Sequence, residues 1–285
     1  KYEVTQAQYV GFLNTLTKAQ QANHIVGDPA SEQGSLAFPN GRSNRNGIVI
    51  RQPASDGKPA TFACDANPES PLGATDDGQN RACNFLVWTD VAAYLDWAGL
   101  SPMTETAFEK VCRGPADPVA KEFAWGTDEV TDANNVVKDG TSRETVDEVL
   151  KPNSGLASHG YRGPKGPLRV GFAGTDTTTR RTIGAAYYGA LELSGNLWEL
   201  VVTLSQPGLE FQGKPGDGQL TDQGKANEPQ WPSANGEGAG FRGGGWNSGI
   251  LSDFRDLAVS DRFYGYDNPT NRRGTVGGRG VRYSR

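Results

Sequence analysis

The sequence is short of several side chains that support common kinds of protein chemistry. Its 285 residues include only two His, three Cys and one Met. No apolar run approaches the roughly 18 residues that a transmembrane helix requires, so we expect no transmembrane segment. The balance of charge is acidic, with a net charge of −5 and a pI near 5.2, and this argues against a nucleic-acid partner, which needs a basic surface.

Glycine and proline, in contrast, are plentiful. The chain has 38 Gly and 17 Pro beside only 35% hydrophobic residues, a composition typical of a globular protein with a modest core and much ordered loop. Six Trp, nine Tyr and eleven Phe supply enough large apolar side chains to close that core. We therefore predict a single folded domain over residues 1–285 rather than a disordered chain.

Three segments near the start of the chain have the pattern of helices. Thr5, Thr89 and Thr104 are their predicted N-caps, because a Thr side chain can accept a hydrogen bond from a free amide at the start of a helix. Short strands and turns follow, so the order predicts an α+β fold rather than an alternating α/β fold. The predicted helices cover residues 5–16, 88–99 and 103–114.

Two long segments lack sustained periodicity. Residues 22–84 and 206–240 are polar and rich in Gly, and we interpret both as insertions, the first of them ordered and carrying short strands. Cys64 and Cys83 lie towards the end of the first insertion, where a disulfide would be a useful staple, and two free thiols are the alternative. Cys112 lies in a predicted helix and is interpreted as a small buried hydrophobic residue.

Four phrases occur in an order typical of one family. Each phrase is weak alone, but together they resemble the formylglycine-generating-enzyme-like domain, from Lys1 to Arg282. The resemblance implies a large elaboration of the C-type lectin fold, with residues 22–84 and 206–240 as insertions. The phrases are KYEVTQAQYVGFLN, WTDVAAYLDWAG with MTETAFEKVCRG, ELSGNLWEL, and FRGGGWN ending in GGRGVR.

The enzymes of that family need residues that this chain lacks. The oxidases resembled here hold copper through two Cys shortly after an RGGSW-like phrase, whereas residues 247–262 contain no Cys. The related iron enzymes, which oxidise thiol-containing histidine derivatives, need three His, and this chain has only His24 and His159, interpreted as surface or turn residues. We therefore predict a protein that is not an enzyme and has no organic cofactor. A divergent oxidase with displaced metal ligands is the alternative.

The resemblance also implies a structural Ca²⁺ site at the turn that reads GNLWE here. Family members bind Ca²⁺ there through carboxylate and backbone carbonyl oxygens, the hard ligands that this ion prefers. The alternative is that Trp198 packs in the core and Glu199 forms a salt bridge with an Arg. Carried onto this sequence, the ligands are the carboxylates of Glu192 and Glu199, the carbonyl groups of Gly195 and Leu197, and Asn134 in a second site.

The last 39 residues use a restricted alphabet. From Asn247 onward there is no Lys, Glu, Gln, Met or Trp, although residues 1–246 contain 43 of them. Randomising both adenines of an Asn codon reaches every amino acid except these five, because the third base stays a pyrimidine. The segment also follows an RGGGW phrase, where variable proteins of diversity-generating retroelements carry their hypervariable segment on this same fold. Chance in a short Gly- and Arg-rich end is the alternative.

We therefore predict a non-enzymatic, receptor- or adhesin-like protein whose residues 247–282 bind a variable macromolecular ligand, a protein or another cell-surface molecule. Tyr and Phe supply contact area at low conformational cost, while Ser, Gly, Asn and Asp give adaptable hydrogen bonds. A lectin of fixed specificity is a further alternative. The last 39 residues have seven Arg and four Asp, which fits either a ligand patch or a solvated, partly paired surface.

Within this segment the sequence separates contact residues from a supporting frame. An exposed aromatic cluster there would form an apolar patch of the size that marks a binding site, while core positions for Ile250, Leu251 and Phe254 are the alternative. The frame would hold the backbone by packing and by guanidinium hydrogen bonds, and comprises Arg242, Trp246, Arg255, Ala258, Ser260, Arg262, Pro269, Asn271 and Arg272. The predicted ligand-binding residues are Ile250, Leu251, Asp253, Phe254, Asp256, Phe263, Tyr264, Tyr266, Asp267, Asn268, Arg273 and Thr275.

Overall fold

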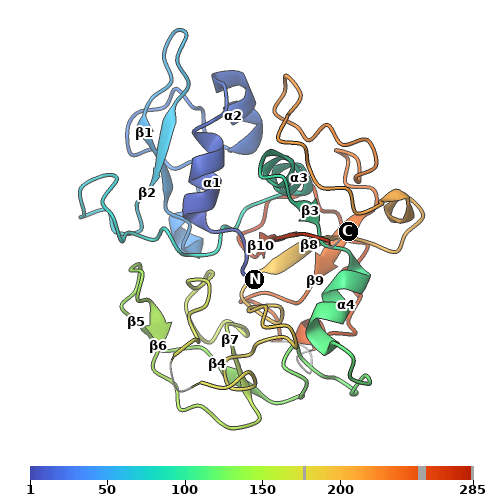
Figure 1. Ribbon diagram of the computed structural model, residues 1–285. Helices are drawn as coiled ribbons and strands as arrows, with labels where there is room; N and C mark the ends of the chain where they lie inside the picture. The colour runs from blue at the N-terminus through green and yellow to red at the C-terminus, as the bar shows by residue number, and fades with distance from the viewer. Residues whose placement is uncertain (176–177, 250–254, 284–285) are drawn as a thin grey trace.

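A three-stranded sheet lies at the centre of the molecule (Figure 1). The computed structural model describes residues 1–175, 178–249 and 255–283. All five residues of the middle strand are buried, as expected for a short and mainly apolar strand with a neighbour on each side. The middle strand is β8 (Trp198–Val202), which pairs antiparallel with β9 (Ala239–Arg242) and parallel with β10 (Val276–Gly277).

Four α-helices are formed by the first 113 residues, and two of the three predicted N-caps are confirmed. Thr5 accepts a hydrogen bond from the Gln8 amide at 3.2 Å, and Thr104 accepts one from the Ala107 amide at 3.0 Å. Each bond satisfies an amide that has no partner within the helix. The helices are α1 (Gln6–Leu13), α2 (Lys18–His24), α3 (Trp88–Trp97) and α4 (Glu105–Arg113).

The prediction for the remaining cap was wrong. Thr89 already lies inside α3, and the carboxylate of Asp90 accepts the hydrogen bond from the Val87 amide at 2.9 Å. The first helix is also shorter than predicted. It ends at Leu13, and Thr17 caps the separate helix α2 through its own bond to a backbone amide.

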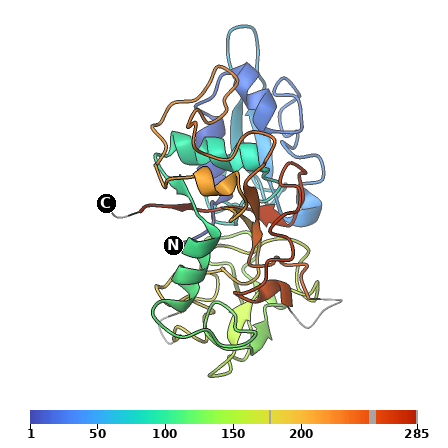
Figure 2. The same cartoon turned by 90° about the vertical axis from the view of Figure 1, so that its right-hand side faces the viewer.

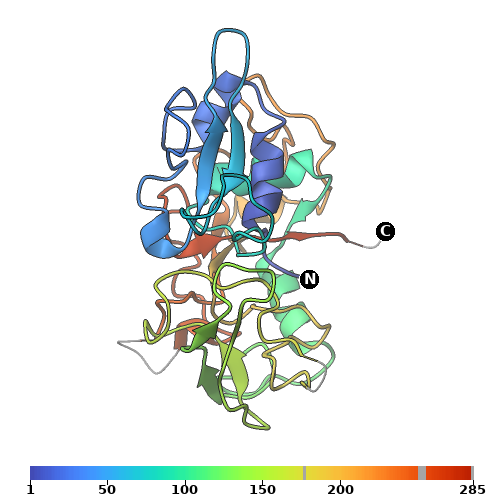
Figure 3. The same ribbon diagram turned by 90° about the vertical axis from the view of Figure 1, so that its left-hand side faces the viewer.

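Several two-stranded sheets surround the centre (Figures 1 and 3). One of them, formed by residues 48–52 and 61–64, lies beside α1. It confirms the prediction that the first insertion carries short strands. Three 3-10 helices complete the described elements: η1 (Arg42–Asn44), η2 (Gly208–Glu210) and η3 (Arg255–Leu257). The pairs are β1 (Ile48–Gln52) with β2 (Thr61–Cys64), β3 (Ser101–Pro102) with β11 (Gly280–Val281), β4 (Val130–Asp132) with β7 (Gly155–Ala157), and β5 (Val136–Val137) with β6 (Thr145–Val146).

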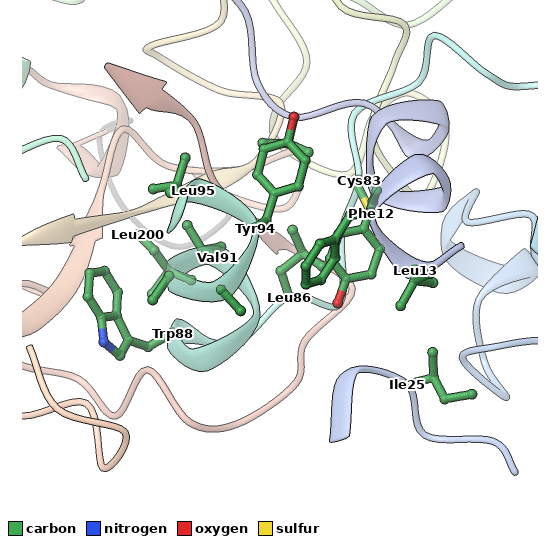
Figure 4. Close-up of a cluster of buried hydrophobic side chains, with 14 of the residues drawn as sticks. Phe12, Leu13, Ile25, Cys83, Leu86, Trp88, Val91, Tyr94, Leu95 and Leu200 are labelled. Atoms are coloured by element: carbon green, nitrogen blue, oxygen red, sulfur yellow. The ribbon is translucent and has the colours of Figure 1, made fainter. Parts of the chain in front are cut away.

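The largest buried cluster joins the N-terminal helices to the central sheet (Figure 4). Phe12 of α1 and Tyr94 of α3 meet edge to face, with ring centroids 6.0 Å apart. Leu200 of β8 and Val276 of β10 belong to the same cluster. Because Val276 lies near the end of the chain, the C-terminal segment is anchored in the core rather than lying on it.

The order of elements is consistent with the predicted α+β class. The helices come before most of the strands, and the strands of the described residues form separate small sheets. The C-type lectin fold and the single-domain division stay predictions. None of the helices within residues 1–175, 178–249 and 255–283 has the length and apolar character that a membrane crossing needs.

All three cysteines are free and buried. Of the two alternatives for Cys64 and Cys83, the structure therefore has two thiols. Burial raises the pKa of Cys64 to about 12, so this thiol stays protonated and unreactive at neutral pH. Cys112 is buried within the core cluster around α4, which confirms its interpretation as a small hydrophobic residue.

Candidate ligand-binding site

The C-terminal segment leaves the central sheet after β9, passes through η3 and returns to the sheet at β10 (Figure 2). Its first residues are held by a neighbouring loop. The Gly160 amide donates to the Ser248 carbonyl group at 2.7 Å, and the Tyr161 amide donates to the Trp246 carbonyl group at 3.1 Å. The Trp246 indole donates to the Gly274 carbonyl group at 2.9 Å, which joins the two ends of the segment.

Arg242 connects the segment to α4 on its buried side. Its side chain is fully buried, donates to Glu105 at 2.9 Å and to Glu109 at 3.1 Å, and also bonds the Val259 carbonyl group. Arg262 pairs with the same Glu109 from the exposed side. Such a guanidinium fork holds several acceptors at once, as predicted for a frame residue.

Arg272 ties the far end of the segment to α3. It donates to the Phe85 carbonyl group at 2.9 Å and forms an ion pair with the buried Asp90. Burial alone would raise the pKa of Asp90, but the Arg272 guanidinium and a hydrogen bond from His24 hold it below its usual value. The interpretation of His24 as a surface or turn residue was wrong, because this ring is buried with Nδ1 at 2.9 Å from Asp90 Oδ1 and Nε2 at 2.8 Å from the Gly224 carbonyl oxygen.

Most Arg residues of the segment are paired, which favours the partly paired surface over an open cationic patch. Besides Arg262 and Arg272, Arg273 donates to Asp267 at 2.7 Å. The hydrogen bond from Arg273 lowers the pKa of Asp267. Arg255 is exposed, and its guanidinium lies 4.8 Å from the centroid of the Phe263 ring.

A pocket of about 580 Å³ opens beside this segment. This volume lies in the range of sites that hold small ligands or single side chains of a partner. Five predicted ligand-binding residues line it together, although the chain separates them by up to 19 positions. They are Asp256, Phe263, Tyr264, Arg273 and Thr275, and the other lining residues are Tyr161, Trp198, Phe241, Asn247, Ser248, Gly249, Arg255 and Val276.

The aromatic side chains of the segment are displayed as predicted. Phe263 is 64% exposed and Tyr266 is 74% exposed. Tyr264 is half-buried, with its ring edge-to-face against Trp198 at 5.0 Å and against Phe263 at 4.9 Å. The exposed Phe263 ring, supported by the half-buried Tyr264, is an arrangement suited to contact with a partner.

The remaining predicted residues divide into two groups. Tyr266, Asp267 and Asn268 lie on the surface of the segment but do not line the pocket. None of the eight predicted ligand-binding residues in the described part of the chain is buried. The other four predicted residues, Ile250, Leu251, Asp253 and Phe254, lie outside the described residues.

The predicted frame is only partly internal. Ala258 and Pro269 are buried, in keeping with a packing role. Ser260 and Asn271 are exposed, and the interpretation of these two as packed frame residues was wrong.

The sequence did not point to Tyr161, Trp198 and Phe241 as site residues, because they lie outside residues 247–282, the segment with the restricted alphabet (the restricted segment). Trp198 and Phe241 come from the adjacent strands β8 and β9, and Tyr161 comes from the loop that bonds Trp246 and Ser248. Only the pairing of these elements brings the three rings to the pocket, so no local sequence signal was present to find them.

The residues of the predicted Ca²⁺ site meet a guanidinium instead. Arg279 donates to both carboxylate oxygens of the buried Glu199, at 2.5 Å for the bond from Nε. Burial raises the pKa of Glu192 to about 7, and its Oε1 accepts the Gly171 amide at 2.9 Å. A cation would have to displace Arg279, so the two carboxylates do not fit a Ca²⁺ site as they are arranged, and the geometry matches the alternative of a salt-bridged Glu199.

The other predicted Ca²⁺ ligands have mainly structural contacts. The Gly195 amide donates to the Gly243 carbonyl group at 2.8 Å, and the Leu197 amide donates to the Glu3 carboxylate at 3.1 Å. The backbone amide of Asn134 donates to the Glu148 carboxylate at 2.9 Å. The side-chain oxygen of Asn134 is buried without a hydrogen-bond partner in the described part of the chain. Ca²⁺ binding stays a prediction.

His159 is the second histidine that was placed wrongly. It is buried, and its Nε2 lies 2.7 Å from Asp132 Oδ1. The hydrogen bond from His159, with help from Arg162, lowers the pKa of Asp132 to about 2. His24 and His159 are therefore both buried beside an Asp carboxylate, and neither lines the pocket.

The chain matches the FGE-sulfatase family, described as a sulfatase-modifying factor enzyme 1-like domain, over residues 1–284. It belongs to that family, as the four phrases predicted. No curated protein matches the chain.

Proposed function

We propose that this member of the family is a non-enzymatic binding protein whose residues 247–282 form a ligand surface diversified by a retroelement, on a frame of C-type lectin fold. The observation that carries the proposal is the meeting of Asp256, Phe263, Tyr264, Arg273 and Thr275 at one pocket. These positions were selected from amino-acid usage and position in the chain alone, and neither of those criteria requires them to share a pocket.

The hydrogen bonds of the segment support this division of labour. Arg242, Trp246 and Arg272 bond buried acceptors or backbone carbonyl groups. Phe263 and Tyr266 are largely exposed, so the fold does not depend on which side chains stand there. A frame of this kind accepts substitution at its contact positions, as an antibody domain does in its loops.

The rival proposal is an oxidase of the parent family with displaced ligands. Its strength is the family itself, which includes enzymes. Against it, the described lining of the pocket contains neither Cys nor His, the ligands that copper and non-haem iron prefer. The three cysteines lie in the core instead.

Two measurements test the proposal. The DNA beside the gene should contain a near-copy of the stretch for residues 247–285 that differs only where the copy has adenine, together with a reverse transcriptase gene. The purified protein, given a thiol peptide with copper or iron, should show no turnover above the metal alone. Finding no such copy would refute diversification, and turnover that is lost on changing a residue of the C-terminal half would establish the oxidase.

Thermal stability tests the predicted structural Ca²⁺ site. Because Arg279 occupies both oxygens of Glu199, we expect 5 mM Ca²⁺ to leave the melting temperature within about 2 °C of its value with a chelator. A larger rise, lost in the Glu192→Gln variant, would restore Glu192 and Glu199 as ligands.

A further inference from the structure

The lining of the pocket comes from two different parts of the chain. Phe263, Tyr264 and their neighbours lie inside the restricted segment, whereas Tyr161, Trp198 and Phe241 precede it. Trp is not reachable by substituting the adenines of an Asn codon, so Trp198 could not arise by that process. Part of the pocket is therefore the same in every variant that diversification would produce.

The constant part is rigidly held. The Trp198 amide donates to the Thr275 carbonyl group at 2.9 Å within the central sheet, and the Phe241 amide donates to the Tyr264 carbonyl group at 3.4 Å. The Tyr161 ring lies edge-to-face against Trp246, with centroids 5.1 Å apart. Trp198 and Phe241 are also buried, so packing holds their rings as a preorganised wall, which costs little conformational entropy when a ligand binds.

Aromatic contacts continue across the pocket into the variable part. Trp198 meets Tyr264 at an interplanar angle of 73°, and Tyr264 meets Phe263 at 81°. Aromatic pairs prefer this edge-to-face geometry, and a further ring entering the pocket can extend the series. The volume of about 580 Å³ is sufficient for an aromatic side chain and the backbone that carries it.

Asn247, the first residue of the restricted segment, adds a directional polar group beside the constant part. Its Nδ2 group donates to the Tyr161 hydroxyl group at 3.3 Å, so its orientation is set from the constant wall. Its Oδ1 atom is buried without a hydrogen-bond partner among the described residues. An amide oxygen is only an acceptor, so it is suited to an N–H or O–H donor on the ligand.

The pocket lining has two Arg and one Asp, and one of the Arg, Arg273, is paired with Asp267 outside the lining. The other two charges, Arg255 and Asp256, are opposite in sign, which favours an uncharged ligand group. We propose that the constant rings of Tyr161, Trp198 and Phe241, together with Asn247 at the start of the restricted segment, form a subsite for an uncharged aromatic side chain with an N–H donor, namely the indole of a Trp on a protein partner. This inference rests on the proposed function, in which the variable residues contact the surface of the partner around that indole.

The probe for this subsite is N-acetyl-tryptophanamide, and N-acetyl-leucinamide is its aliphatic control. Ligand-observed NMR measures the binding of each compound to the full chain. We expect the tryptophan amide to bind and the leucine amide to bind at least tenfold more weakly. Tyr161→Ala and Asn247→Leu should each weaken the tryptophan amide about tenfold, since each loses a central contact of the subsite. Phe263→Ser should change its affinity less than threefold, because a contact at the exposed rim stays partly solvated.

Circular dichroism confirms that each variant is folded before its affinity is compared. Binding that survives Tyr161→Ala and Asn247→Leu but is lost in Phe263→Ser would overturn this subsite and leave the proposed function standing. So would equal binding of both amides, or binding of methyl glycosides without the tryptophan amide. The near-copy in the neighbouring DNA tests diversification independently of every one of these results.

Discussion

At the scale of single residues, the most unusual feature is a set of buried carboxylates that share one cation. Glu3, Glu192 and Glu199 are all buried near Arg279. Burial raises the pKa of each carboxyl group, and the mutual repulsion of the carboxylates adds to that effect at Glu3 and Glu192. With its pKa raised to about 7, Glu192 is partly protonated near neutral pH.

This arrangement predicts how stability depends on pH. The pKa of Glu192 is about 7 in the folded protein, against 4.5 in a model carboxyl group. Between these two values the folded state keeps a proton that the unfolded state releases, so the free energy of unfolding should fall as pH rises. Glu192→Gln should remove about 1–3 kcal/mol of that fall between pH 5 and pH 8, measured by urea unfolding. The exposed Glu210→Gln is the matched control, and an equal slope in both variants would contradict the prediction.

At the scale of elements, the caps show how far local sequence decides structure. Thr89 and Thr104 are both Thr residues near the start of a helical pattern, yet only Thr104 caps its helix. At α3 the carboxylate of Asp90 takes that place, while it also holds His24 and Arg272. The cap is still a local contact, since Asp90 is three residues from Val87, whereas its other two partners come from distant parts of the chain.

The two threonines provide a matched test of this difference. Thr104→Ala should lower the free energy of unfolding by about 1 kcal/mol, because the Ala107 amide loses its acceptor at the start of α4. Thr89→Ala should cost less than about 0.5 kcal/mol, since the Val87 amide keeps its bond to Asp90. Chemical denaturation measures both, and equal losses would show that the caps are misassigned.

At the scale of the whole molecule, the C-terminal segment combines a fixed path with free contact positions. The chain enters the segment from β9, and strand β10 near its end lies in the central sheet beside β8. Arg242, the last residue of β9, forms an ion pair with α4, and Arg272, just before β10, forms one with α3. A segment held at so many points can change its outward side chains without losing its course.

Stability should therefore depend on which face of the segment is changed. The double variant Phe263→Ser, Tyr266→Ser should melt within about 2 °C of the parent protein, because both rings are largely exposed. Tyr264→Ser should melt about 5 °C lower, because it removes a ring that packs on Trp198 at 5.0 Å. A large loss in the double variant, seen by calorimetry, would mean that the segment is structural rather than a display surface.

Local chemistry determined much of this protein. Thr5 and Thr104 cap helices through local contacts, because their hydroxyl oxygens accept hydrogen bonds from backbone amides three residues away. The restricted alphabet after Asn247 needs no structure to be read, and the family phrases depend on residues in short runs.

Tertiary structure decided what these local signals cannot contain. The burial of His24 and His159, and the pairing of Glu199 with Arg279, each join residues that lie far apart in the chain. The pocket is of the same kind, because its constant rings lie on β8, β9 and a separate loop. Contacts of long sequence separation form only when the whole core closes, and for that reason the sequence indicated the variable half of the site while the fold alone supplied the other half.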